Sequence, residues 1–304
     1  MSEFVYKIDI LSESQVEYFK ELTNKHYKDF VKVIVNEDPD VFELFVDNLL
    51  SELAIGDINT KGMSSLEKLY LMIVLRAYNI SPTVSFSCDT DEETDDGKTV
   101  KLNINIDVIQ LAQKIERLKV VPKFEIESGG VVIRGGLPKR FHYTDVQHAV
   151  ADCIDTIILP DREVIDLIHL DLTEKIRMVD SLPSHVLPRV FEYLLKQEEV
   201  IKKDPVIVIE TEKNIKVEKE SYIALFNGSI PEIIKLLYRI NLKEFYINEY
   251  SLMKKFKFSY EQLQQITPGE LSVYIDVIQD DMSREKQETE KQQQDQNREF
   301  LPPQ

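Results

Sequence analysis

The acidic stretch of residues 89–97 is the densest group of potential metal ligands in the chain. Its sequence, DTDEETDDG, supplies carboxylate oxygens, which are the ligands that Ca²⁺ prefers. An EF-hand loop also needs a bidentate glutamate at a fixed distance after its glycine, and none follows Gly97 at that distance. The spacing therefore favours a solvated hairpin tip over a calcium site.

The histidines and cysteines show none of the spacings that mark a catalytic or zinc site. No histidine belongs to an HExxH pair, and Cys88 and Cys153 are far apart without a CxxC partner. No serine lies in a nucleophile elbow, and the segment GGVVIRGG matches neither GxGxxG nor a Walker sequence. We therefore expect no enzyme activity, no catalytic residue, no cofactor and no bound metal.

Arg76 directly follows the unbroken apolar run of residues 69–75. That position predicts a guanidinium that is mostly buried. A buried guanidinium needs a carboxylate or several backbone carbonyls as partners, because an unpaired buried charge is costly. We expect a structural role for Arg76 rather than a catalytic one.

Helix-start signals in the sequence indicate where the helices of the chain begin. Residues up to about Asn59 are predicted to be helical, with Val16, Phe19 and Leu22 on one face. Later helix starts are marked by capping-box pairs, in which a polar N-cap residue is followed three positions later by a glutamate or glutamine. These pairs are Ser64 and Glu67, Asp171 and Glu174, Ser229 and Glu232, Ser259 and Gln262, and Thr267 and Glu270.

Three hairpins are predicted between the helices, because apolar residues alternate on either side of turn signals. The paired segments are residues 83–87 with 100–106, 120–126 with 131–133, and 206–209 with 215–217. The pattern predicts an α+β fold that is helix-rich, with small antiparallel β-hairpins in the central part and a helical C-terminal region.

The chain is predicted to have four segments. Residues 1–60 form an N-terminal helical segment, and residues 61–220 form a central α/β body with the hairpins. Residues 221–283 form the C-terminal helical region. Residues 284–304 are expected to be a disordered Gln-rich tail, because they hold too little apolar surface to offset chain entropy.

The composition is that of an acidic globular protein. Hydrophobic residues make up 43% of the chain and charged residues 30%. The 54 acidic residues outnumber 37 basic ones and give a net charge of −17, which argues against binding to nucleic-acid phosphates. The longest apolar run is far shorter than the roughly 20 residues that cross a bilayer. With no signal-peptide core at the N-terminus, we expect an intracellular protein without a membrane span.

The C-terminal region is dense in large apolar and aromatic side chains. A helical segment of about 60 residues cannot bury all of them, because small units bury a smaller share of their surface. Tyrosine and phenylalanine are also residues that protein interfaces favour. We therefore expect partner contacts here, with Phe245, Tyr246, Tyr250 and Tyr274 as candidate partner-binding residues.

Four stretches together resemble one protein family. They are SLEKLYLMIVLRAYNISPTVSFSC, GGLPKRFHY, LDLTEKIRMVDSLPSHVLPRVFEYL and IPEIIKLLYRINLKEFYINEYSLMKKFKFSYEQLQQITPGELSVYI. Their apolar, proline and arginine positions resemble the baseplate hub assembly proteins of T-even-type contractile-tailed phages, over roughly residues 64–282. Some chains of this type carry a CxxC-like hairpin. Here Asp91 stands where a second cysteine would follow Cys88, which argues against zinc at the hairpin.

The resemblance implies a late viral protein that helps to build the central hub of the tail baseplate, either as a hub component or as an assembly chaperone. It implies other phage tail and baseplate hub proteins as partners, with the tape measure protein as a further candidate. It places the protein in the host cell cytoplasm during assembly, and in the virion if it stays in the tail baseplate. The sequence leaves the oligomeric state open.

Two other classes of function are alternatives. An acidic adaptor or inhibitor unrelated to tails, such as a nucleic-acid mimic, needs its carboxylates on one continuous face, whereas here they are spread over every segment. A hydrolase with a non-standard site needs a cleft that gathers histidines and carboxylates.

Overall fold

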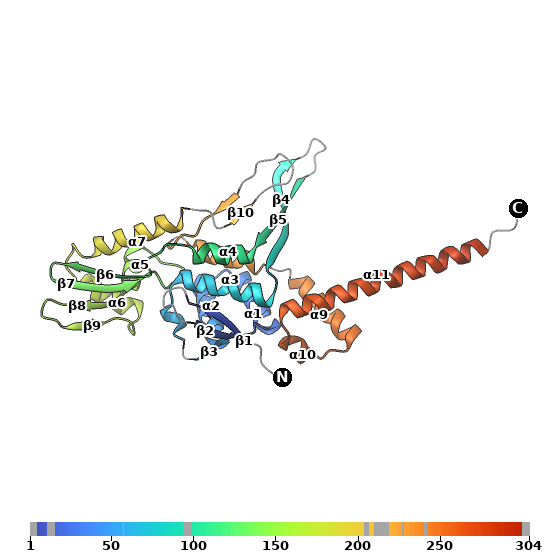
Figure 1. Ribbon diagram of the computed structural model, residues 1–304, viewed down its shortest axis with the longest axis horizontal. Helices are drawn as coiled ribbons and strands as arrows, with labels where there is room; N and C mark the ends of the chain where they lie inside the picture. Colours follow the sequence, from blue (N-terminus) through green and yellow to red (C-terminus); the bar gives the residue numbers. More distant parts are fainter. Residues whose placement is uncertain are drawn as a thin grey trace. The chain divides into compact units, whose positions relative to one another are not determined.

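The computed structural model describes residues 5–10, 16–56, 58–93, 99–203, 207–209, 219–226, 228–239 and 242–299 (Figure 1). Within these, side chains are not described for residues 16, 86–93, 99–104, 207–209, 219–220 and 291–299. The fold is α+β, as predicted, with small antiparallel sheets in the central part and a helical C-terminal region. The chain divides into two compact units. Unit 1 comprises Met1–Glu21 with Phe30–Arg239, and unit 2 comprises Leu22–Asp29 with Ile240–Gln304.

Unit 1 begins with a small antiparallel sheet, which corrects the prediction of a helix there. Its strands, in the order β1-β2-β3, are Val5–Asp9, Val16–Lys20 and Ala54–Ile55. Phe19 of β2 lies opposite Tyr6 on one side and Ala54 on the other, and its side chain is fully buried. The stretch VEYFK is rich in β-branched and aromatic residues, which fit a pleated surface better than a helix.

Unit 1 continues with a helical core built around one largely enclosed helix. The helices are α1 (Asn24–Asn36), which enters unit 1 at Phe30, α2 (Pro39–Leu53), α3 (Ser65–Asn79), α4 (Val108–Glu116) and α8 (Ser229–Leu237). Helix α3 packs against α2, α4 and α8, and nearly all of its side chains are buried. A helix that is apolar all round is stable only when it is covered on every side.

Arg76, near the end of α3, lies where its position in the sequence predicts. Its side chain is 6% exposed. Its guanidinium donates to the carbonyl of Leu237 in α8 and to that of Ser81. The arginine therefore ties the end of α3 to the end of α8, two elements that are far apart in the sequence.

We expect Arg76→Ala to lower the free energy of unfolding by about 3 kcal/mol, because it leaves buried carbonyls without donors and opens a cavity. Far-UV circular dichroism during urea unfolding measures this, since the chain has no tryptophan. Arg162→Ala, at an exposed turn, is the control and should leave the midpoint unchanged. A wild-type midpoint for Arg76→Ala would contradict the assignment.

The central hairpins form as predicted. Strands β4 (Thr83–Glu93) and β5 (Thr99–Asp107) pair across the acidic stretch, whose tip lies outside the described residues. A second sheet has the antiparallel order β6-β7-β8-β9, with β6 Lys123–Ser128, β7 Val131–Gly136, β8 Ile154–Ile158 and β9 Val164–Asp166. Gly129 and Gly130 turn β6 into β7 with positive φ angles, which glycine adopts without steric cost.

Three helices cover this second sheet and share a hydrophobic core with it (Figure 1). They are α5 (Val146–Cys153), α6 (Leu172–Asp180) and α7 (Leu187–Ile201). Strands β10 (Ile207–Ile209) and β11 (Lys219–Ser221) pair after α7. The predicted second strand at residues 215–217 lies outside the described residues.

Most of the predicted helix starts are confirmed. Reciprocal capping boxes join Ser64 to Glu67, Asp171 to Glu174, Ser259 to Gln262 and Thr267 to Glu270. A helix does begin at Ser229, but the predicted capping box of Ser229 with Glu232 is wrong, because Ser229 is not the N-cap residue. Gly228 precedes α8, and the Ser229 hydroxyl instead contacts the backbone N–H and carbonyl of Ala224. Helix α8, predicted as part of the C-terminal region, belongs to unit 1.

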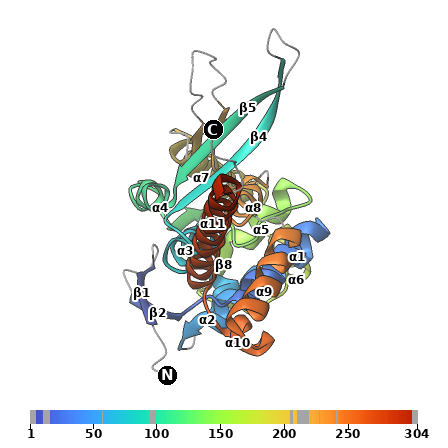
Figure 2. The same ribbon diagram turned by 90° about the vertical axis from the view of Figure 1, so that its right-hand side faces the viewer.

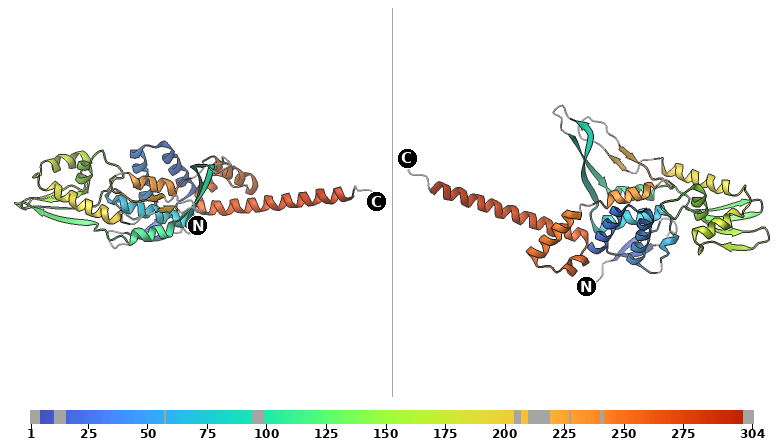
Figure 3. Two further views of the ribbon diagram at one scale, coloured as in Figure 1. Left: turned by 90° about the horizontal axis from the view of Figure 1, so that it is seen from above. Right: turned by 180° about the vertical axis from the view of Figure 1, so that it is seen from behind.

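Unit 2 consists of α9 (Leu242–Phe256), α10 (Tyr260–Gln265) and α11 (Pro268–Glu299), with residues 22–29 beside them (Figures 2 and 3). Helix α11 continues to Glu299, whereas a disordered tail is predicted from residue 284. Its glutamate, lysine and glutamine residues have good helix propensity, although the described side chains after Met282 are exposed. Among the described residues, no helix is both long and apolar enough to cross a membrane.

Candidate functional site

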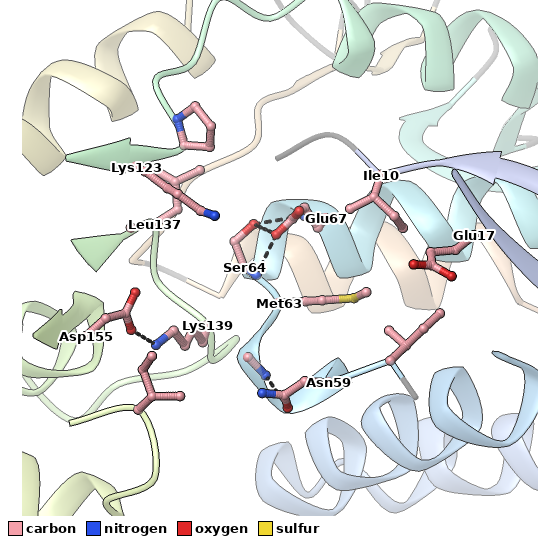
Figure 4. A pocket seen from close by; sticks show the side chains of 15 residues that line it. Ile10, Glu17, Asn59, Met63, Ser64, Glu67, Lys123, Leu137, Lys139 and Asp155 are labelled. Carbon is pink, nitrogen blue, oxygen red and sulfur yellow. Dashed lines mark hydrogen bonds and ion pairs between the residues drawn. The ribbon is translucent and has the colours of Figure 1, made fainter. Parts of the chain in front are cut away.

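Unit 1 contains a cavity of about 380 Å³ between β1–β2, the start of α3, and the loop after β7 (Figure 4). Its lining carries five charged side chains, from Glu17, Glu67, Lys123, Lys139 and Asp155. Cavities of this size with a few convergent polar groups are the usual places for a small ligand. The cavity is therefore the first candidate for a chemical site.

Most of the polar groups in this cavity are engaged in holding the fold together. Glu67 accepts from the Ser64 N–H at 2.9 Å and from its hydroxyl at 2.8 Å, which is the capping box of α3. Asn59 accepts from the Gly62 N–H at 3.1 Å. Lys139 forms an ion pair with Asp155 (Figure 4). The described lining contains no histidine or cysteine.

Behind Lys139 lies a buried polar network. The Asp152 carboxylate accepts from the Tyr143 hydroxyl at 2.6 Å and from the Lys139 N–H at 3.0 Å. The Lys175 ammonium donates to the carbonyls of Asp152 and Ile154, at 3.3 and 3.2 Å. Burial and the neighbouring Lys139 lower the pKa of Lys175. These contacts join the loop after β7 to α5 and α6.

Cys153 is fully buried next to this network. Burial, reinforced by the Asp152 carboxylate, raises the pKa of its thiol well above the ordinary value. A thiol in that state is a poor nucleophile, because the thiolate is the reactive form. The side chain of Cys88 and those of the acidic stretch from Asp89 to Glu93 lie outside the described side chains.

The loop of residues 137–141, part of the GGLPKRFHY stretch, is anchored to two helices. The Lys68 ammonium of α3 donates to the Lys139 carbonyl at 2.9 Å and lies 2.7 Å from the Asp47 carboxylate of α2. The Glu43 carboxylate accepts from the Phe141 N–H at 2.9 Å and from the Arg140 guanidinium at 3.0 Å. The polar groups of this loop thus hold the sheet to the helical core of unit 1.

The histidines do not come together. His148 lies 3.6 Å from Asp145, and His26 contacts Thr23 through its ring nitrogen. His142, His169 and His185 are exposed in separate segments. In the described part of the chain, no three histidine, cysteine or acidic side chains are grouped so that they could hold a metal ion.

The candidate partner-binding residues of unit 2 divide into buried and exposed ones. Phe245 is 3% exposed and packs edge-on against Tyr27, so its side chain is part of the core of unit 2 and the prediction of a partner contact is corrected. Tyr246, Tyr250 and Tyr274 are exposed, and Tyr250 is the most open of them at 65%.

Further exposed apolar side chains accompany these tyrosines, and none of them is among the candidate partner-binding residues predicted from the sequence. On α9 they are Ile247, Met253 and Phe256, and on α11 they are Val273, Val277 and Met282. Recurrence at helical spacing with Tyr250 and Tyr274 is the signal that could have found them. Together the residues Tyr246, Ile247, Tyr250 and Met253 are called the α9 stripe below.

One side of α9 is held by a buried ion pair that only the tertiary structure reveals. The Lys28 ammonium lies 3.0 and 2.8 Å from the two carboxylate oxygens of Glu249. The rings of Phe245, Tyr246 and Tyr260 surround the ammonium at 4.8–5.5 Å. Glu249 also accepts from the Gln264 amide at 2.7 Å. These contacts fix α9 against α10 and residues 22–29, while the side chains of the α9 stripe remain exposed to solvent.

Comparison with models of known protein families gives a match. Residues 1–227 match the family model described as T4 bacteriophage base plate protein. The matched region covers most of unit 1, whereas α9, α10 and α11 follow it. Comparisons with curated proteins and with solved structures find no match.

Proposed function

Because the chain belongs to the T4-type phage base plate protein family, we propose that it acts in the central hub of the base plate, as a hub component or as an assembly chaperone. It acts by protein–protein contacts with other base plate proteins. The hub proteins and the tape measure protein are the candidate partners. Assembly takes place in the host cell cytoplasm, and a hub component then stays in the virion tail whereas a chaperone leaves.

The observation that carries this proposal is the exposed apolar surface of unit 2. The α9 stripe and the exposed side chains of α11 place tyrosine, isoleucine, methionine and valine in solvent on adjacent helices. Contiguous exposed apolar patches on a folded protein mark surfaces that another molecule covers. Tyrosine and methionine are also enriched at protein interfaces.

We also propose that the chain has no catalytic activity. In the cavity of unit 1, Glu67 caps a helix and Lys139 pairs with Asp155, and Cys153 is a buried thiol of raised pKa. The family membership also disfavours an acidic adaptor unrelated to tails. Wild-type particle yields from a variant with Lys139→Met and Asp155→Leu, if it folds, would support a structural role for that pair.

Tyr250→Glu tests the proposal. We expect it to reduce the amount of base plate proteins that co-purify with the tagged full-length chain by about tenfold, because a carboxylate at the centre of an apolar contact is costly to desolvate. Val35→Glu, on α1, is the matched control, since Val35 is also 65% exposed. Quantitative mass spectrometry of the purified complexes gives the measurement.

Co-purification of Tyr250→Glu at the wild-type level, with circular dichroism showing a folded chain, would contradict the proposal for this surface. Mass spectrometry of mature particles separates the two roles. The chain should be present in stoichiometric amount if it is a hub component and absent if it is a chaperone.

A further inference from the structure

The exposed face of α9 ends in a cluster of lysines. Lys254, Lys255 and Lys257 lie within four residues, and no other window of that length in this acidic chain holds three lysines or arginines. All three are exposed. Lys255 lies 3.5 Å from Asp281, and no ion pair among the described residues includes Lys254 or Lys257. The cluster is therefore a local positive patch on a chain of net charge −17.

Lys254 connects the α9 stripe to this patch, whereas Lys255 faces Asp281. Tyr246, Tyr250 and Met253 recur at spacings of four and three residues, which places them on one face of the helix. Ile247, Tyr250 and Lys254 recur at three and four residues and share the edge of that face. A lysine near a helix C-terminus also complements the helix dipole. Lys257, however, lies beyond Phe256, the last residue of α9, with a positive φ angle.

We propose that the α9 stripe and the lysine cluster together bind an amphipathic helix of another base plate protein, whose apolar side covers the stripe and whose acidic residues meet the lysines. This rests on the proposed function and specifies the chemistry of the partner. An apolar stripe at helical spacing fits a partner helix that presents its own side chains at the same spacing. The lysine cluster then sets the direction in which the partner helix lies, because the lysines are at one end of the α9 stripe and attract the acidic end of the partner helix.

The charge distribution favours a narrow partner segment over an anionic membrane. At physiological salt, exposed charges act over about 8–10 Å, so a single helix on the stripe meets mainly the lysines beside it. A membrane presents a broad negative plane, which would also face the acidic residues that dominate the rest of the chain.

Three synthetic helical peptides of equal length test the inference with the full-length chain. They share one pattern of leucines and carry glutamate, glutamine or lysine at every polar position. We expect the acidic peptide to bind about tenfold more tightly than the neutral one, by fluorescence anisotropy at low salt, and to lose this advantage when salt is raised. Equal affinity for the three peptides would overturn the inference.

Charge reversal at the cluster identifies the site. Lys254→Glu with Lys257→Glu should remove the preference for the acidic peptide while leaving binding of the neutral peptide unchanged. Arg284→Glu with Lys286→Glu makes the same change in charge at exposed positions of α11 and is the control. A preference for the acidic peptide that survives the reversal at Lys254 and Lys257 would place the site elsewhere and overturn the inference.

Two further outcomes would assign the face to another occupant. Sedimentation with phosphatidylglycerol vesicles that is lost on the reversal of Lys254 and Lys257 would indicate a lipid surface and overturn the inference. A dimer that dissociates in the same variant during analytical ultracentrifugation would indicate a second copy of the chain. If Tyr250→Glu blocks co-purification of base plate proteins but the peptides show no charge preference, the proposed function stands and only this inference fails.

Discussion

Replacing Lys68 with methionine is expected to lower the free energy of unfolding by about 3–5 kcal/mol, because it leaves the Asp47 carboxylate buried without its counter-ion. The two side chains are 2% and 9% exposed, and the ammonium lies 2.7 Å from the carboxylate. The substitution also removes the hydrogen bond to the Lys139 carbonyl and the contact with the Phe141 ring. The loop that joins the second sheet to α2 and α3 should therefore loosen first.

Urea unfolding followed by circular dichroism measures the change, and hydrogen exchange of residues 137–141 locates it. Lys68→Met combined with Asp47→Leu should recover much of the lost stability, because well-packed apolar residues often replace a buried ion pair at little cost. Lys196→Met removes an exposed pair with Glu192 and should leave the midpoint unchanged. Wild-type stability for Lys68→Met alone would show that the pair does not hold the loop.

Glu249→Ala is expected to have a comparable effect on unit 2, about 3–5 kcal/mol, because the Lys28 ammonium then remains buried with only ring faces and a tyrosine hydroxyl around it. Gln264 also loses its acceptor. The loss should appear as faster hydrogen exchange in α9 and α10, with residues 22–29 released from these helices.

Two variants act as controls for this change. Lys28→Met combined with Glu249→Met removes both charges and should be more stable than Glu249→Ala alone. Lys255→Met removes the more exposed pair with Asp281 in the same unit and should change stability little. Unaltered hydrogen exchange in α9 of Glu249→Ala would argue that the ion pair does not hold unit 2 together.

The structure also changes how the exposed surface of unit 2 is understood. Phe245 and Tyr246 are neighbours in the sequence and equally aromatic, yet one is buried and the other exposed. The buried one packs against Tyr27, a residue more than two hundred positions away. Exposure of this kind depends on contacts distant in the sequence, and the residue types alone could not assign it.

Local features of this protein are determined by its sequence. A capping box needs only residues three positions apart, so Ser64 with Glu67 and Ser259 with Gln262 are predicted correctly. A two-glycine turn between alternating apolar residues likewise specifies the hairpin of β6 and β7. The burial of Arg76 follows from the unbroken apolar run before it.

Only the tertiary structure decides features that depend on distant partners. Residues 16–20 form a strand because β1 and β3 supply hydrogen bonds on both sides, which outweighs the apparent helical spacing of Val16, Phe19 and Leu22. In the sequence, nothing distinguishes Lys28 and Glu249 from other charged residues. They become a buried ion pair because the fold brings together two segments that are separated by 220 residues. Such a pair forms only when the fold brings both charges together and removes them from water, and no local pattern in the sequence records that.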